Sequence, residues 1–344
     1  MLKKTKFYIN NNFLHRKTVL VTGGTGSFGY AIIEKLLQCA KLKRLIVFSR
    51  DEYKQFQMKE KLKKYKNFNI LRFFIGDVRN VDRLMMAFRT VDYVIHAAAL
   101  KQIDTAEYNP FECINTNILG AENVVKASLY NSVKKVIVIS TDKAVNPINL
   151  YGASKLASDK VFISANSYAG GQNTFFSVVR YGNVLDSRGS VISLFKELLF
   201  NQKLRQIPVT DQRMTRFWIE KQEGVDFVLR SLKNMQGSEI FIPKIPSMSI
   251  IDMIKCLNIK VKTKKIGIRP GEKLHETLLA KEDTRNAYEG KDYYLILPSW
   301  KIKKISLKKF NVNKVPDDFE YVSNKNSQKL SSKVIRDIFN FSEK

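Results

Sequence analysis

Short apolar runs alternate with longer amphipathic segments through the first half of the chain. The apolar runs, rich in Val, Ile, Leu and Phe, occupy residues 18–21, 45–48, 70–74, 93–96, 135–139 and 176–180. Segments with helical hydrophobic periodicity, such as 30–39 and 121–130, lie between them. This alternation predicts a mostly parallel sheet with helices on both faces. Because such strands are buried on both faces, continuous apolar runs suit them.

The pattern becomes less regular beyond about residue 185. Helical periodicity returns at residues 191–199, 221–234 and 331–339, and prolines separate shorter segments between these. We therefore expect an α/β chain in two parts. Residues 1–184, completed by part of 205–242, would form a nucleotide-binding domain. Residues 185–344 would form mainly a smaller α/β substrate-binding lobe and a C-terminal tail.

A glycine-rich turn follows the first predicted strand and opens the first predicted helix. It reads Thr22-Gly23-Gly24-Thr25-Gly26-Ser27-Phe28-Gly29, with a G-x-x-G-x-x-G spacing. Residues without a Cβ let backbone amides approach a pyrophosphate at a helix N-terminus. The sequence thus predicts a Rossmann-type doubly wound sheet that binds a dinucleotide. The expected contacts in this turn are Gly23, Thr25, Gly26, Ser27, Phe28 and Gly29.

The end of the second predicted strand indicates which dinucleotide is bound. Ser49, Arg50 and Lys54 can contact a 2′-phosphate, which favours NADP, whereas Asp51 keeps NAD possible. The other interpretation of Arg50 and Lys54 is a solvated start of a helix. Further cofactor contacts are expected beyond the third and fourth strands, at Asp77, Val78, Ala97, Ala98, Ala99 and Lys101.

Two pairs of ionisable residues follow the fifth predicted strand. Tyr151 and Lys155 are four residues apart, so they lie on one face of a helix, where a tyrosine can exchange a proton with a sugar hydroxyl. Asp142 and Lys143, an acid beside a possible base, stand just before them. Oxidation at one carbon does not require this second pair, but elimination of water does. The other interpretation of Asp142 and Lys143 is a surface ion pair, although strand ends at this edge line the ligand crevice.

Charge limits the choice of partner. The 344-residue chain has 59 Lys and Arg against 32 Asp and Glu, a net charge of +27. The basic residues recur in segments such as 41–66, 260–265 and 301–309, and they are mostly lysine, without the Arg and aromatic interleaving of a single-strand binder. We therefore expect the positive field to attract an anionic nucleotide-sugar, and we expect no nucleic-acid partner.

The sequence offers no support for a membrane, disulfide or metal site. No apolar run reaches the ~20 residues of a membrane span, and the polar, basic N-terminus has no apolar signal region. We expect a cytoplasmic protein with no membrane partner. The three cysteines, Cys39, Cys113 and Cys256, are widely spaced and form neither a disulfide framework nor a metal pattern.

Taken together, these motifs resemble the extended short-chain dehydrogenase/reductase superfamily. More narrowly, the chain resembles the inverting UDP-N-acetylglucosamine 4,6-dehydratases, the first enzymes of pseudaminic acid biosynthesis. The segments that carry the resemblance are residues 22–29, 108–110, 115–117, 140–144, 151–155, 180–184, 187–190, 210–219, 239–244 and 269–276. The blocks at 210–219, 239–244 and 269–276 lie outside the shared superfamily fingerprint and are specific to the narrower group.

The resemblance implies roles for individual residues. It assigns catalysis to Thr141, Asp142, Lys143, Tyr151 and Lys155, and it assigns nucleotide-sugar contacts to Asn183, Thr215, Arg269 and Glu272. The other interpretation of Arg269 and Glu272 is a salt bridge within a turn. Further candidate substrate contacts are Lys101 and Arg188, of which Arg188 could pair with a diphosphate or hold a loop in place. The resemblance also implies a homo-oligomer, a hexamer, and a role in making surface or flagellar glycans. The chain departs from the family where Gln102, Ile103 and Asp104 replace His, Val and Pro, at Leu185-Asp186, and in its longer N-terminus.

The expected chemistry begins with oxidation at carbon 4 of the sugar. Tyr151 would take the 4-hydroxyl proton as hydride passes to NADP⁺, with Thr141 holding that hydroxyl and Lys155 lowering the pKa of Tyr151. Lys155 would also bind the ribose, so Tyr151 and Lys155 are predicted cofactor contacts as well. A neutral Lys143 would then remove the carbon-5 proton, and a protonated Asp142 would assist loss of the 6-hydroxyl. Both protonation states oppose the ordinary pKa values, and we expect burial to shift each group toward its neutral form. Hydride return to carbon 6 and protonation on the opposite face would invert carbon 5.

Three alternatives stay open at this point. A UDP-hexosamine 4-epimerase would use the same cofactor and the Tyr–Lys pair, but would lose no water and has no clear use for Asp142 with Lys143. A catalytically silent NADP-binding protein is disfavoured by the intact Thr141, Tyr151 and Lys155 set. A basic nucleic-acid binder would show salt-sensitive retention on DNA and no nucleotide-sugar binding.

Overall fold

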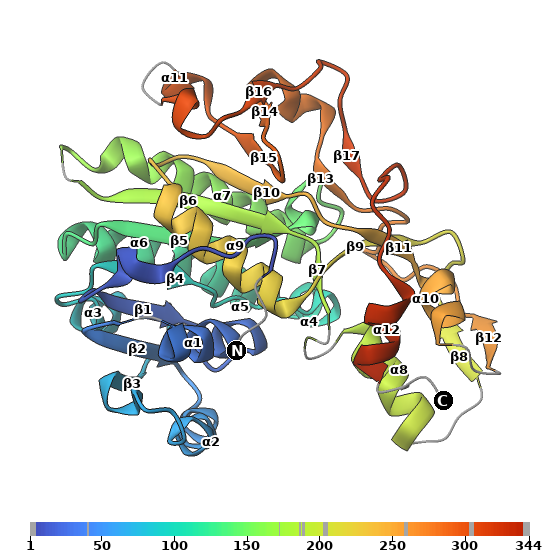
Figure 1. The fold of residues 1–344 in the computed structure, drawn as a ribbon, viewed down its shortest axis with the longest axis horizontal. Coiled ribbons are helices and arrows are strands. Elements are labelled where there is room, and N and C mark those ends of the chain that lie inside the picture. The colour runs from blue at the N-terminus through green and yellow to red at the C-terminus, as the bar shows by residue number, and fades with distance from the viewer. Residues whose placement is uncertain are drawn as a thin grey trace.

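The computed structural model describes residues 5–39, 41–171, 173–185, 187, 190–201, 206–257, 261–302 and 306–339. Its central feature is a ten-stranded sheet in the order β3-β2-β1-β4-β5-β6-β10-β15-β14-β16 (Figure 1). The strands from β3 to β10 run parallel to one another, and β15, β14 and β16 continue the sheet in antiparallel fashion. The predicted doubly wound α/β sheet is confirmed.

The central parallel strands form where continuous apolar runs can be buried on both faces, whereas the edge strands β3 and β16 have exposed residues. The parallel strands are β1 (Thr18–Thr22), β2 (Arg44–Ser49), β3 (Leu71–Ile75), β4 (Tyr93–His96), β5 (Lys135–Thr141), β6 (Phe175–Tyr181) and β10 (Ile240–Pro243). The remaining three are β14 (Ala287–Glu289), β15 (Tyr293–Ile296) and β16 (Asn313–Lys314). All five residues of β1 are buried, as the apolar pattern predicted.

Helices pack on both faces of this sheet. In Figure 1, α9 lies in front of the sheet and α7 lies behind it, and both contact β5 and β6. The helices of this part are α1 (Ser27–Cys39), α2 (Glu52–Leu62), α3 (Val81–Ala87), α4 (Ile103–Tyr108), α5 (Pro110–Ile114), α6 (Gly120–Tyr130), α7 (Leu150–Tyr168) and α9 (Lys221–Asn234). Short 3₁₀ or π turns occur at Asn11–Leu14, Phe68–Ile70, Asn115–Leu119 and Asp142–Ala144.

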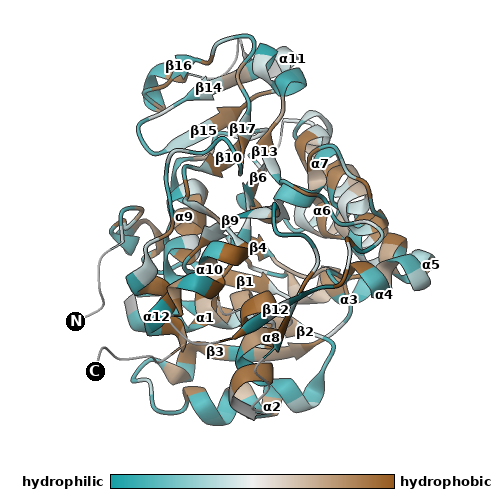
Figure 2. Cartoon of the chain, turned by 90° about the vertical axis from the view of Figure 1, so that its right-hand side faces the viewer, coloured by the Kyte–Doolittle hydropathy of each residue, from teal (hydrophilic) through white to brown (hydrophobic). Residues whose placement is uncertain are grey.

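A second hydrophobic core lies beside the carboxyl edge of the main sheet. Its buried residues include Ile192, Phe195, Trp218, Met253 and Ile335. The buried residues of this core come mainly from α8 (Val191–Lys196), α10 (Ile250–Cys256), α12 (Ser332–Phe339) and the strands β8 (Gln206–Val209), β9 (Thr215–Ile219) and β11 (Ser247–Ser249). The short strands β7 (Asn183–Val184) and β12 (Lys262–Lys265) pair with β9 and β8. Figure 2 shows hydrophobic and hydrophilic residues on α10, because one face of that helix packs on this core.

The remaining described elements lie in the second half of the chain. They are β13 (Thr277–Leu279), β17 (Tyr321–Val322), α11 (Ser299–Ile302) and turns at Glu197–Asn201, Lys281–Asn286 and Leu307–Lys309. The sequence pattern did not indicate that strands from residues 287–314 would extend the main sheet. The division into domains at residue 184 stays a prediction. Strands from both sides of residue 184 contribute to the main sheet.

Parallel pairing brings the carboxyl ends of β1, β4, β5 and β6 to one edge of the sheet. The loops that leave these ends carry most of the predicted site residues, so the fold gathers them in one place. No helix among the described residues is long and apolar enough to cross a membrane.

Candidate active site

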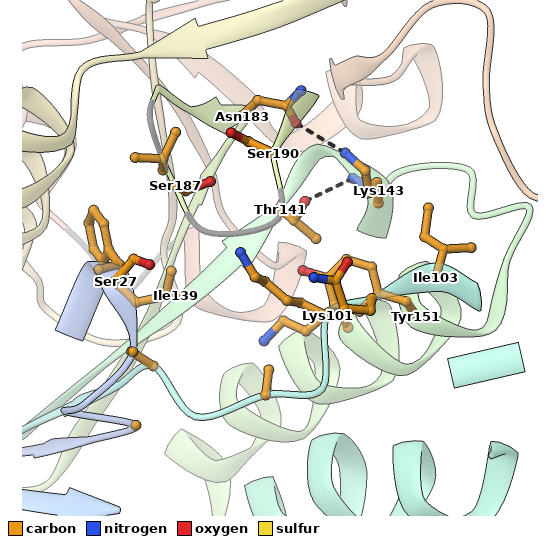
Figure 3. Close-up of a pocket in the computed structure, with 18 of the residues that line it drawn as sticks. Ser27, Lys101, Ile103, Ile139, Thr141, Lys143, Tyr151, Asn183, Ser187 and Ser190 are labelled. Carbon is orange, nitrogen blue, oxygen red and sulfur yellow. Dashed lines mark hydrogen bonds between the residues drawn. The ribbon is translucent and has the colours of Figure 1, made fainter. Parts of the chain in front are cut away.

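A cleft of about 850 Å³ opens at the carboxyl edge of the sheet. Its walls come from the glycine-rich turn, the ends of β2 to β6, and residues between 182 and 276 around the second core. Figure 3 shows Ser27, Lys101, Thr141, Tyr151 and Asn183 surrounding the same space. One cavity is therefore lined by the predicted cofactor contacts and by four of the predicted catalytic residues, Thr141, Lys143, Tyr151 and Lys155, whereas Asp142 is fully buried and does not line it.

The glycine-rich turn packs against the loop after β4 too closely for side chains. Gly23 has φ +64°, and a Cβ there would lie 2.7 Å from the backbone nitrogen of Ala98. A Cβ on Gly29 would lie 2.4 Å from the carbonyl oxygen of Gly23. The turn thus brings backbone amides to the start of α1, which suits a pyrophosphate, so this part of the cleft fits a dinucleotide.

The other predicted cofactor contacts line the same end of the cleft. They are Thr25, Gly26, Ser27, Phe28, Ser49, Arg50, Lys54, Asp77, Val78, Ala97, Ala98, Ala99 and Lys101. Asp51 caps α2 by accepting from the backbone N–H of Lys54, and its carboxylate also pairs with the Lys54 ammonium at 2.5 Å. The hydrogen bonds from Lys54 lower the pKa of Asp51. Arg50 is 55% exposed and lies 3.7 Å from Asp77.

The predicted catalytic residues converge from the end of β5 and the start of α7. Thr141 ends β5, and its hydroxyl oxygen accepts from the backbone N–H of Lys143 in the following 3₁₀ turn (Figure 3). Asn149 caps α7 by accepting from the backbone N–H of Gly152 at 2.7 Å. This start of the helix places Tyr151 and Lys155 one turn apart, both buried and both lining the cleft.

Lys143 lies between two buried carboxylates. Its ammonium donates to Asp142 at 3.0 Å and to the amide oxygen of Asn183 at 3.3 Å, and it lies 3.4 Å from Glu276. Burial lowers the pKa of Lys143, but the attraction of Asp142 and Glu276 outweighs it and raises that pKa above its ordinary value. The expectation that burial makes Lys143 neutral is therefore wrong, because two carboxylates stand beside it.

Tyr151 also differs from expectation in its protonation. Burial raises the pKa of Tyr151 to about 12, against the opposing effects of the Lys143 charge and a hydrogen bond from Thr141. We expected Lys155 to lower this pKa, but the nearby cation that does so is Lys143. Burial lowers the pKa of Lys155, and the charge of Asp159 opposes that shift. The phenol is thus the stable form of Tyr151 in this arrangement.

Glu276 is the residue of this site that sequence reasoning missed. It is 2% exposed, lines the cleft and reaches Lys143 from the segment before β13. Burial raises the pKa of its carboxyl group. Glu276 is the last residue of the segment 269–276, which carries part of the family resemblance and could have indicated it. Only the folded chain shows that this carboxylate contacts Lys143, which is 133 positions away in sequence.

The predicted substrate contacts are placed less uniformly. Asn183, Arg269, Glu272 and Lys101 line the cleft. Thr215 lies between the lining residues Met214 and Arg216, and its hydroxyl bonds His275 at 2.8 Å and Ser323 at 2.7 Å. Arg188, like Asp186, lies outside the described residues, so its role stays a prediction. Gln102 and Asp104, two of the departures from the family, also line the cleft.

The histidines and acids of the described residues form no cluster of three or more that could hold a metal ion. His96 is buried and bonds the Thr22 hydroxyl through Nδ1 at 2.8 Å. Burial, together with the charge of Lys155, lowers the pKa of His96 to about 3. His96 is therefore a neutral core residue beneath the cofactor end of the cleft.

Comparison with known families decides the relationship. The model of a family described as "Polysaccharide biosynthesis protein" matches residues 19–298, which include nearly the whole cleft. The chain belongs to this family. A member from Campylobacter jejuni subsp. jejuni serotype O:23/36 (strain 81-176), named "UDP-N-acetylglucosamine 4,6-dehydratase (inverting)", is 51% identical over 335 residues, covering 95% of this chain and 98% of that protein.

Other relatives show how broad the likeness is. A "UDP-glucose 4-epimerase" from Rickettsia bellii (strain OSU 85-389) is 45% identical over 287 residues, 81% of this chain and 82% of that protein. The X-ray structure of Pen from Bacillus thuringiensis is 36% identical, with TM-score 0.86 over 96% of this chain and 98% of that one. DesIV (dTDP-glucose 4,6-dehydratase) from Streptomyces venezuelae, solved with NAD and TYD bound, shares the fold, with TM-score 0.66 at 22% identity over 75% and 86% of the two chains.

The predicted resemblance to inverting UDP-N-acetylglucosamine 4,6-dehydratases and to short-chain dehydrogenase/reductase folds is thus confirmed. The match to the C. jejuni protein runs through 95% of this chain. It therefore reaches beyond the nucleotide-binding part and includes the blocks around residues 210–219 and 269–276. Those blocks supply Arg216, Arg269, Glu272 and Glu276 to the cleft.

Proposed function

We propose that this family member converts UDP-N-acetylglucosamine to UDP-2-acetamido-2,6-dideoxy-β-L-arabino-hexos-4-ulose. The observation that carries the proposal is that Tyr151, Lys155 and Lys143 line one cleft with a dinucleotide cradle, and that the buried Asp142 is hydrogen-bonded to Lys143. Tyr151 with Lys155 suits oxidation at carbon 4, and Asp142 with Lys143 suits loss of water. The 51%-identical relative that is named for this reaction supports the choice of substrate.

A bound nicotinamide cofactor would supply the hydride acceptor for carbon 4 and, later, the hydride donor for carbon 6. Tyr151, once its own phenolic proton has passed to solvent, takes the proton of the 4-hydroxyl, which Thr141 holds in place through its own hydroxyl. Lys143 is the nearby cation that favours the phenolate as this proton moves. The resulting ketone makes the carbon-5 proton acidic enough to be removed.

Loss of water then uses the second pair. Lys143 takes the carbon-5 proton, and Asp142 gives a proton to the departing 6-hydroxyl. Asp142 is completely buried, and it accepts hydrogen bonds from Thr141 and Lys143, both at 3.0 Å. The acid is therefore held next to the base, as removal of H and OH from adjacent carbons demands. Protonation of carbon 5 on the opposite face completes the inversion.

We further propose NADP as the cofactor. Asp51, the acid that could accept the ribose hydroxyls of NAD, is occupied by Lys54, while Arg50 faces the cleft and is exposed enough to meet a phosphate. Arg50→Ala should weaken NADP⁺ binding about ten- to a hundredfold, the value of one charge-assisted contact, and should leave NAD⁺ binding unchanged. Titration of the two dinucleotides measures this, with Lys61→Ala on the exposed face of α2 as the control. Equal losses for both dinucleotides would count against a phosphate contact.

The 4-epimerase reading keeps one specific observation in its favour, the 45%-identical relative named UDP-glucose 4-epimerase. An epimerase would use Tyr151 and Lys155 in the same way but would return hydride to carbon 4. The buried charges of Asp142, Lys143 and Glu276 distinguish the two proposals, because isomerisation at carbon 4 has no step that needs them.

The deciding experiment is incubation of the purified protein with UDP-N-acetylglucosamine, followed by mass spectrometry and proton NMR in deuterated water. We expect loss of the mass of one water molecule from the sugar and deuterium at carbon 5, with NMR reporting inversion there. An unchanged mass with the galacto isomer would identify an epimerase instead. No turnover even with added NADP⁺ would contradict both. A cytoplasmic homo-oligomer acting at the start of a pseudaminic acid route is the setting that the resemblance implies.

A further inference from the structure

The polar end of the cleft contains a compact cluster of buried charges. Asp142 and Lys143 come from the turn after β5, Arg216 from β9, and Lys273 and Glu276 from the segment before β13. Lys143, Arg216 and Glu276 line the cleft. Opposite charges held so far from water interact strongly, so the cluster fixes where protons reside.

Glu276 is held rigidly at the centre of this cluster. Its backbone N–H donates to the Ser323 hydroxyl, and its carbonyl accepts from the Ser323 backbone N–H, both at 2.9 Å. Its Oε1 lies 3.4 Å from Lys143 and 3.9 Å from Arg216, and its Oε2 lies 3.9 Å from Lys273. Within the described part of the chain, the buried Oε2 has no hydrogen-bond partner. Glu276 therefore keeps an unused acceptor, which is costly for a buried carboxylate that serves structure alone.

The charge on Lys143 creates a chemical problem for loss of water. Two carboxylates hold its amine as an ammonium, and an ammonium has no lone pair with which to take the carbon-5 proton. Under the proposed function, Asp142 needs its own proton for the leaving hydroxyl. The remaining carboxylate in contact with Lys143 is Glu276.

We propose that Glu276 is the proton partner of Lys143, a positioning residue that accepts the ammonium proton before elimination and returns it afterwards. The proposal rests on the dehydratase function. Transfer breaks one N–H bond of Lys143 and forms an O–H bond on Glu276. The freed lone pair then bonds the carbon-5 proton, the C–H electrons form the double bond to carbon 6, and the C–O bond breaks. The departing oxygen takes the Asp142 proton and leaves as water.

The same contacts restore the starting state. Lys143, again an ammonium, gives a proton to Asp142 at 3.0 Å, and Glu276 then returns its proton to Lys143 at 3.4 Å. Carbon 5 gains a proton from solvent on its other face, and this proton is matched by the phenolic proton that Tyr151 gives to solvent before it takes the 4-hydroxyl proton, so the cycle balances. Burial raises the pKa of Glu276, with Asp142 acting in the same direction and Lys143, Arg216 and Lys273 opposing it. A proton on Glu276 is therefore accessible during turnover.

The test is Glu276→Gln, which keeps the shape of the side chain but accepts no proton, beside Glu276→Asp and the exposed control Glu282→Gln. At neutral pH we expect the Gln variant to eliminate water from the substrate about a hundredfold more slowly than the wild type does. It should still reduce its bound cofactor on adding substrate, because Tyr151 is intact, and absorbance of the reduced nicotinamide reports this. It should also lose deuterium exchange at carbon 5. The Asp variant should recover part of the rate.

The pH profile separates a proton partner from a merely structural residue. Without Glu276, Lys143 loses one of the two carboxylates that raise its pKa, but Asp142 still raises it, so most of the amine stays protonated at neutral pH. Lys143 must then release its proton to solvent. The rate of water elimination by the Gln variant should therefore rise roughly tenfold per pH unit between about pH 6 and 9, while the wild-type rate changes little. The other charged groups that act on Lys143 and Glu276 are Asp142, Arg216 and Lys273, and the Gln variant retains all three.

Each other outcome overturns the inference. Wild-type activity in the Gln variant, or a deficit of the same size at every pH, would show that Glu276 holds no proton for Lys143. Loss of cofactor reduction in both the Gln and Asp variants would assign Glu276 a structural role instead. If the wild type itself reduces cofactor but releases no water, the proposed function fails and this inference fails with it. If the wild type dehydrates the substrate and the Gln variant does so at the same rate, the inference about Glu276 is wrong but the proposed function stands.

Discussion

Replacing Lys143 by methionine should abolish loss of water while leaving oxidation at carbon 4 in place. Methionine matches the length of the side chain but has no amine, so no base reaches carbon 5, and a general base of this kind contributes about 10²–10⁴-fold to rate. Mixing the variant with UDP-N-acetylglucosamine should give a rise in absorbance of the reduced cofactor and no dehydrated product. The combination of cofactor reduction and absent product is the expected signature of a reaction halted at the 4-keto sugar.

Lys160→Met is the matched control, because Lys160 lies on the exposed face of α7. The Lys143 substitution also leaves Asp142 and Glu276 together without the cation between them, so the pair should take up a proton and the fold should lose some stability. Thermal unfolding beside the cofactor signal distinguishes that effect from lost catalysis. Rapid appearance of the galacto isomer in this variant would instead support an epimerase.

Tyr151→Phe should stop the reaction one step earlier. The phenol oxygen is the atom that takes the 4-hydroxyl proton, and phenylalanine removes it without changing the buried ring. We expect a fall of about 10²–10⁴-fold in both cofactor reduction and product formation. Tyr168→Phe, at an exposed position of the same helix, is the control. Stopped-flow absorbance on mixing with substrate measures the first step directly.

Together the two variants separate the two catalytic pairs. Lys143→Met should retain cofactor reduction and lose dehydration, whereas Tyr151→Phe should lose both. Retained cofactor reduction in Tyr151→Phe would mean that another group takes the 4-hydroxyl proton, and the nearest buried alternative to examine would be Tyr181, which also lines the cleft. Its pKa is raised well above the ordinary value by burial, so it would be a poor acceptor.

Local patterns along the chain account for much of this protein. The six apolar runs of the first half became β1 to β6, because residues that are apolar on both sides of a strand can be buried only between two layers of helices. The predicted helix at 221–234 is α9 (Lys221–Asn234). The glycine spacing at 23, 26 and 29 and the Tyr151–Lys155 pair were equally readable, since turn chemistry and helical periodicity depend on near neighbours.

Contacts between distant segments were not readable in the same way. The extension of the main sheet by β15, β14 and β16 depends on short strands whose pairing partner lies far away in sequence. The engagement of Thr215 with His275 and Ser323 has the same origin. A substrate contact was expected of Thr215, and in the structure its hydroxyl faces residues 60 and 108 positions away.

The sequence by itself predicted the parallel part of the main sheet, the glycine-rich turn, the two pairs of ionisable residues and the family of this protein, because each depends on residues close together in the chain. The tertiary structure alone decided the protonation of the site. Asp142 and Lys143 are neighbours in sequence, and burial by itself lowers the pKa of Lys143. Asp142, together with Glu276, which comes from the segment before β13 and lies 3.4 Å from Lys143, raises the pKa of Lys143 against the effect of burial, because two carboxylates attract the ammonium in a site with little water.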